Sequence, residues 1–191
     1  MRGLSGVMIA ACLVVSCPAA AQTPTEAASI IEALIAADDS DAALIAAHTL
    51  YAQVWDMTQG LGFSQALLVA EPAAGYGIYN PRSTATFKPG EPIILSVEPY
   101  GYGYGTPAEG LFTIGFIVDL QVRTIAGEVL GDSPNLTELD LTSRYPNREF
   151  QANITYTLGG LEPGRYVLQT TLRDKNSVKN GVFETEIEII D

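Results

Sequence analysis

Apolar residues recur at two different spacings along the chain, and the change falls near residue 60. Between residues 23 and 56 they recur every three to four positions, which is typical of helices that bury one face. Thr23 and Glu26 fit a capping box at the start of this segment. A short acidic turn at residues 38–41 interrupts the pattern. The spacing therefore predicts a helical hairpin over residues 22–60.

From residue 61 onward, apolar and polar residues alternate in short runs separated by Gly, Pro and Asn. Alternation is regular over residues 149–158, and a longer apolar run at 111–124 predicts a strand bent near Gly115. Such short strands without intervening helices predict a mainly β domain over residues 61–191, built as an antiparallel β-sandwich. The expected strands cover residues 63–70, 84–87, 93–97, 111–124, 127–130, 149–158, 165–173 and 182–190.

Two segments of this domain resemble a known class of fold. Residues 161–168 include Tyr166 and resemble the tyrosine corner of immunoglobulin and fibronectin type III sandwiches, in which a Tyr bonds back to the backbone upstream. Residues 87–92 resemble the start of an early strand in exported bacterial Ig-like modules. The chain is thus similar to uncharacterised exported bacterial proteins with such a sandwich. The resemblance implies an Ig-like fold and a structural role for Tyr166, and it implies no particular chemistry.

The first 21 residues have the pattern of an export signal. Arg2 precedes a short apolar run, and Ala19 and Ala21 form a small-x-small cleavage site, so we expect cleavage after Ala21. The mature protein would then be periplasmic or secreted. In the alternative interpretation, Cys17 ends a lipobox-like segment and carries a lipid anchor. No later stretch is long and charge-free enough to predict a transmembrane segment.

The amino-acid composition limits the classes of function that are compatible with this chain. The chain has 22 Asp and Glu against 10 Lys and Arg, which argues against a nucleic-acid partner because phosphate contacts need a basic surface. Cleavage would remove Arg2 and both cysteines, leaving a net charge of −13 and no thiol. We find no motif for a metal or another cofactor and no catalytic signature, and we therefore expect a binding or scaffold module rather than an enzyme.

The densest candidate for binding is a pair of Tyr- and Gly-rich segments. Tyrosine offers a flat apolar face and a hydroxyl, and neighbouring glycines allow close approach to the backbone. These segments could contact an envelope protein or a glycan, or else cap one end of the sandwich. The five tyrosines are Tyr76, Tyr79, Tyr100, Tyr102 and Tyr104.

Two alternatives stay open. An envelope glycan hydrolase would need paired carboxylates, for which Glu98, Glu109 and Asp119 are nominal candidates. Asp119 would otherwise face solvent or pair with one of the arginines at positions 123, 144 and 148. An assembly role would use the acidic helical hairpin, because residues 22–81 hold seven acids and no base.

Overall fold

The structure, a computed structural model, describes residues 22–191. The predicted signal peptide at residues 1–21 and the alternative lipidation of Cys17 therefore lie outside the described residues.

Two helices come first, α1 (Pro24–Ala36) and α2 (Ser40–Asp56). The predicted capping box is confirmed: the Glu26 backbone N–H donates to Thr23 Oγ1 at 3.3 Å, and the Thr23 N–H donates to Glu26 Oε2 at 2.8 Å. The hydrogen bond from the Thr23 N–H to the Glu26 carboxylate also holds the pKa of Glu26 below its usual range. Among residues 22–191, neither helix combines the length and hydrophobicity that a membrane span requires.

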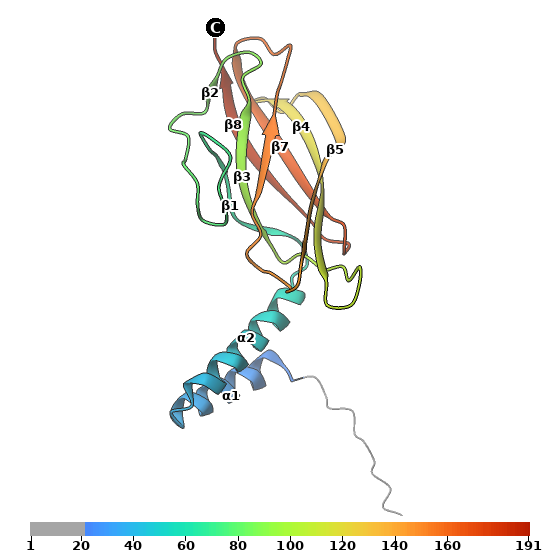
Figure 1. Cartoon of the computed structure of the whole chain (residues 1–191). Coiled ribbons are helices and arrows are strands. Elements are labelled where there is room, and N and C mark those ends of the chain that lie inside the picture. The colour runs from blue at the N-terminus through green and yellow to red at the C-terminus, as the bar shows by residue number, and fades with distance from the viewer. Residues whose placement is uncertain (1–21) are drawn as a thin grey trace, which may run out of the picture. The chain divides into compact units, whose positions relative to one another are not determined.

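The rest of the chain is mainly β and forms two sheets, whose strands are labelled in Figure 1. A three-stranded sheet has the order β1-β3-β6, and a five-stranded sheet has the order β2-β8-β7-β4-β5. Neighbouring strands are antiparallel except β2 and β8, which are parallel. The strands are β1 (Gly62–Leu68), β2 (Thr86–Phe87), β3 (Ile93–Tyr100), β4 (Phe112–Thr124), β5 (Val129–Ser143), β6 (Ala152–Tyr156), β7 (Gly164–Asp174) and β8 (Asn180–Ile189).

One hydrophobic core takes side chains from both sheets. Leu95 and Ile154 of the three-stranded sheet and Phe116 of the five-stranded sheet are all buried in it. The hydroxyls of Tyr156 and Thr170 form a buried hydrogen bond of 2.8 Å between the two sheets. Burial raises the pKa of Tyr156 to about 12, so this phenol stays protonated over the physiological range.

Contacts divide the chain within α2, and the second compact unit is Tyr51–Asp191, called here the β-rich unit. The sequence placed the boundary ten residues later, at the end of the predicted hairpin. The last turns of α2 belong to the β-rich unit because Trp55 is buried in the core, where its indole N–H donates to the Tyr102 carbonyl oxygen at 2.8 Å. Residues 22–50 are called the helical unit.

The pairing of β4 with β5 is irregular at two places, between Val118 and Leu120 and between Val122 and Arg123, and neither lies at Gly115. Gly115 pairs with Asp140 in a regular stretch. At the first shift, residues 134–136 of β5 lie opposite Asp119, whose carboxylate accepts hydrogen bonds from the Arg173 guanidinium and the Asn135 N–H. The partner of Asp119 is therefore Arg173 on β7, and not an arginine at position 123, 144 or 148.

The hydrogen bond predicted for Tyr166 is present. Tyr166 lies near the start of β7, and its hydroxyl donates to the Glu162 carbonyl oxygen at 2.7 Å. The ring is buried in the core, so the bond ties the connection before β7 to the packed interior.

Candidate functional site

An open groove runs between β5 and β6, each of which is the end strand of its sheet. It consists of two hollows of about 520 Å³ and 460 Å³, and Leu139 and Asn153 line both. β5 forms its ladder with β4, and β6 forms its ladder with β3. The outer rows of backbone N–H and C=O groups on both end strands therefore border the same groove, which is the principal candidate site.

A loop that carries Tyr76 forms part of the groove wall. Tyr76 and Gly75 line the larger hollow. The loop is held by Glu98, a buried β3 residue whose Oε1 accepts the Gly77 N–H at 2.8 Å. It is also held by Asn153 on β6, whose side-chain amide exchanges two hydrogen bonds with the Ala73 backbone. Tyr76 therefore sits on an anchored loop.

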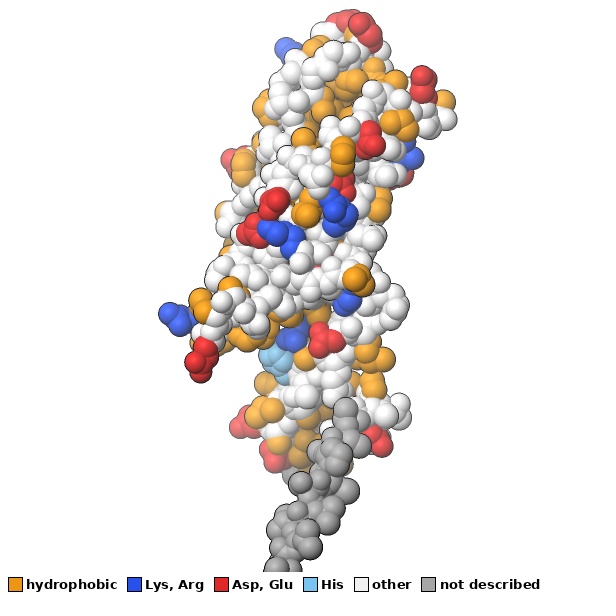
Figure 2. Space-filling view, turned by 90° about the vertical axis from the view of Figure 1, so that its right-hand side faces the viewer, with side chains coloured by type: hydrophobic (Ala, Val, Ile, Leu, Met, Phe, Trp, Pro, Cys, Tyr) orange, Lys and Arg blue, Asp and Glu red, His pale blue; other side chains and the backbone are white. Residues whose placement is uncertain are grey.

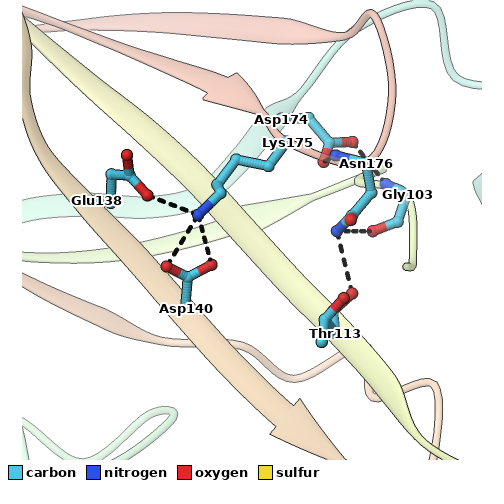
Figure 3. A network of polar contacts seen from close by, with 7 residues as sticks. All are labelled: Gly103, Thr113, Glu138, Asp140, Asp174, Lys175 and Asn176. Carbon is cyan, nitrogen blue, oxygen red and sulfur yellow. Dashed lines mark hydrogen bonds and ion pairs between the residues drawn. The ribbon is translucent and has the colours of Figure 1, made fainter. Parts of the chain in front are cut away.

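Charged residues form a row beside the groove on the outer side of β5. Glu138 and Asp140 border the larger hollow, and the Lys175 ammonium lies 2.6 Å from Glu138 Oε2 and 2.9 Å from Asp140 Oδ1 (Figure 3). The hydrogen bond to Glu138, followed in size by the one to Asp140, raises the pKa of Lys175. Figure 2, which views the molecule from the side of β5, shows basic and acidic side chains grouped together on this face.

Two of the five predicted tyrosines are core residues, which corrects the expectation that they face a ligand. Tyr102 is fully buried, and Tyr104 is half-buried against the same core. Both hydroxyls donate to the Asn147 carbonyl oxygen, at 2.9 Å and 2.8 Å. Burial raises the pKa of the Tyr102 phenol far above its usual range and that of Tyr104 to about 12. They fasten the connection between β5 and β6.

The glycines beside these tyrosines make room for the chain itself. A Cβ on Gly103 would lie 3.2 Å from the Asn176 carbonyl oxygen, and one on Gly105 would clash with Thr113 Oγ1. Figure 3 shows the contacts: Asp174 accepts the Gly103 N–H, and the Asn176 amide donates to the carbonyl oxygens of Gly103 and Thr113. The close approach expected of a partner is made by the β7–β8 turn and, at Gly105, also by Thr113 on β4.

The other two tyrosines are not part of the groove wall described above. Tyr100 is exposed at the end of β3, and its ring lies over Gly62. Tyr79 lines a separate hollow of about 140 Å³. Of the five tyrosines predicted from the sequence, Tyr76 alone lines the groove.

The carboxylates considered for hydrolysis are not brought together in either hollow of the groove. Glu98 is buried in the three-stranded sheet, Asp119 lies in the five-stranded sheet, and Glu109 is exposed in the β3–β4 connection. The Arg173 hydrogen bond holds the pKa of Asp119 below its usual range, which is the opposite of what a general acid requires. Among residues 22–191, no three His, Cys, Asp or Glu side chains converge as metal ligands would.

The Asp119–Arg173 pair predicts a pH-dependent contribution to stability. A carboxyl with a lowered folded-state pKa stabilises the fold above its unfolded pKa of about 4, and this contribution is lost as pH falls through the folded pKa. We expect Asp119→Asn to reduce the free energy of unfolding by about 1 kcal/mol at pH 7 and much less at pH 2.5. Urea unfolding at both values measures this.

Asp132→Asn removes an exposed carboxyl on β5 and serves as the control. A constant difference between wild type and Asp119→Asn at the two pH values would contradict the assignment.

The helical unit leaves several large apolar side chains in solvent. Leu44 and Ile45 are exposed by 73% and 70%, and the buried residues of this unit are Ala27 and Ala43. In the part of α2 that belongs to the β-rich unit, Tyr51 is exposed and Trp55 is buried. The apolar residues of this helix therefore do not form one continuous buried stripe. The assembly role of the acidic hairpin stays a prediction.

No model of a known protein family matches the chain, and no curated protein is detectably similar to it.

Proposed function

We propose that the chain is an exported binding module and that its groove accepts an extended peptide as an added strand. The observation that carries this proposal is the position of the groove between the end strands of both sheets. End strands offer unpaired backbone groups, and extended peptides commonly bind by continuing a sheet.

We also propose that the β-rich unit is an Ig-like sandwich. Its support is the division into sheets β1-β3-β6 and β2-β8-β7-β4-β5 around a shared core, together with the hydrogen bond from Tyr166 to Glu162. Export, with cleavage after Ala21 or an anchor at Cys17, is proposed on the sequence pattern alone.

A peptide fits the groove better than a glycan does. Sugar rings stack on exposed aromatic faces; of the five candidate tyrosines the groove wall contains Tyr76 alone, and the other aromatic residues of its lining, Phe150 and Tyr156, are buried. The opposite wall is the edge of β5, which is 15 residues long and can supply a ladder of backbone hydrogen bonds. The hydrolase alternative has no comparable support, because Glu98, Glu109 and Asp119 do not lie together in the groove.

The test uses a synthetic peptide of about nine residues in which Gln and Val alternate, a length typical of strands. Titrated into the isotopically labelled protein, it should shift backbone amide resonances along β5, β6 and the Tyr76 loop. A version N-methylated at alternate residues lacks the hydrogen-bond donors of one edge and should not bind. Shifts confined to another part of the protein would refute the proposed site.

A matched pair of variants locates the binding. Thr137 and Thr142 are both exposed on β5, but only Thr137 is among the lining residues of the two hollows described. Thr137→Trp should fill the groove and lower the peptide affinity at least about tenfold, whereas Thr142→Trp should change it little. Equal effects of the two variants would contradict binding in the groove.

A further inference from the structure

We infer that the strand accepted by the groove alternates basic with apolar residues, and that Glu138 and Asp140 recognise its basic positions. This inference rests on the proposed function and adds the chemistry of the partner to it.

The alternation is set by β5 itself. Successive side chains of a strand point to opposite faces of the sheet, so Glu138 and Asp140 share one face while Leu139 points to the other. Leu139 is packed against the core, whereas the Glu138 and Asp140 side chains are exposed by 60% and 58%. A strand added beside β5 would continue both faces, one acidic and outward, the other apolar and facing the core.

The outward row already contains a lysine, and Figure 3 shows how it lies. Lys175 follows β7, its backbone N–H donates to the Gly115 carbonyl oxygen on β4, and its side chain passes Gly115 to reach Asp140 on β5. A Cβ on Gly115 would lie 2.7 Å from Asp140 Oδ1 and 3.0 Å from Lys175 Cδ. The missing side chain at Gly115 thus lets an ammonium approach Asp140 from one side.

An added strand would approach the same carboxylates from the other side. Residues directly opposite in neighbouring strands have Cβ atoms about 5 Å apart, within reach of an ion pair between Lys and Asp or Glu. Lys175 supplies one positive charge to two carboxylates, so one negative charge is left at this place. Of the described residues that line the two hollows, none is Lys or Arg, and Glu149 adds a further carboxylate.

The same charges argue against a second copy of this chain as the occupant. Pairing β5 with β5 of another copy would bring Asp132, Glu138 and Asp140 of both strands together along one edge. Like charges opposite one another destabilise a ladder, and charged edges are a common defence against self-association. The acidic edge therefore favours a basic strand from another protein.

The test compares three synthetic peptides of about nine residues in which Val alternates with Lys, Gln or Glu. We expect the wild-type protein to bind the Lys peptide at least about fivefold more tightly than the Gln peptide, and the Glu peptide most weakly. The double variant Glu138→Gln/Asp140→Asn should lose the preference for Lys while retaining its affinity for the Gln peptide. Lys175→Met should strengthen binding of the Lys peptide and leave the Gln peptide unchanged.

Glu128→Gln/Glu188→Gln removes the same total charge from exposed positions outside the groove and should keep the preference. Equal affinity for the Lys and Gln peptides, or a preference that survives Glu138→Gln/Asp140→Asn, would overturn this inference while leaving the groove as a peptide site. Failure of all three peptides to shift the β5 and β6 resonances would instead overturn the proposed function.

Discussion

Replacing Tyr102 with alanine is expected to lower the free energy of unfolding by about 3–5 kcal/mol, the range for large aromatic residues removed from a core. Tyr102 is fully buried, and its ring contacts Trp55 at 4.9 Å and Phe116 at 5.6 Å between centroids, both edge to face. Its loss would leave a cavity among these rings and remove a hydrogen bond to Asn147. The melting temperature should fall by roughly 6–20 °C for a domain of this size.

Circular dichroism during urea unfolding is the suitable measurement. The chain has a single tryptophan, Trp55, and because its indole lies against the Tyr102 ring its fluorescence would change for local reasons. Tyr102→Phe keeps the ring and is the matched control. The Asn147 carbonyl oxygen retains the hydroxyl of Tyr104 as a donor, so this variant should lose only about 1 kcal/mol.

The two variants separate the structural role from the binding role first predicted for Tyr102. A Tyr102→Ala protein that unfolds at the wild-type urea concentration would contradict the buried position of this side chain. Because the ring has no exposed surface, we expect Tyr102→Phe to bind the Gln–Val peptide as the wild type does.

The sequence predicts elements well where one face of an element is buried. Alternation over residues 149–158 placed Ala152, Ile154 and Tyr156 on one face, and all three are core residues of β6. The capping box at Thr23 is likewise a local pattern with a local cause. In both places the signal comes from residues that are close in sequence.

The sequence predicted β5, one of the two strands that border the groove, worst of all the strands. Only residues 127–130 were expected to be extended here, whereas β5 covers Val129–Ser143. Most of its residues are exposed, because an end strand beside an open groove buries little on either face. Alternation of polar and apolar residues in β5 is confined to residues 138–141, which is too short a run to mark a 15-residue strand, and the site that depends on this strand was missed with it.

The local sequence also does not show which atoms come close to a glycine. The Gly–Tyr alternation at residues 100–105 predicts access for a partner, but the atoms that approach Gly101, Gly103 and Gly105 belong to the chain itself. Those atoms come from residues as far away in sequence as Ser177. Tertiary contacts of this kind cannot be predicted from the spacing of residues that are neighbours in sequence.

Gly101→Ala is expected to lower the free energy of unfolding by about 2–4 kcal/mol, the sum of a backbone and a steric contribution. Gly101 has φ of +83°, a conformation that alanine adopts at a cost of about 1–2 kcal/mol. A Cβ there would also lie 2.5 Å from Thr58 Oγ1 and 3.1 Å from the Gly60 carbonyl oxygen. Thr58 cannot move away freely because its hydroxyl donates to the carbonyl oxygens of Trp55 and Gly101.

Gly110→Ala separates the two contributions. Gly110 has φ of +68°, but nothing lies within 4 Å of a Cβ built on it, so this variant carries the backbone cost alone. We expect Gly101→Ala to exceed Gly110→Ala by about 1–2 kcal/mol in urea unfolding. Thr58→Ala should reduce that excess in the double variant, because it removes the oxygen that a new Cβ would meet. Equal losses for the two glycine variants would mean that Gly101 is needed for its backbone conformation and not for the close approach of Thr58.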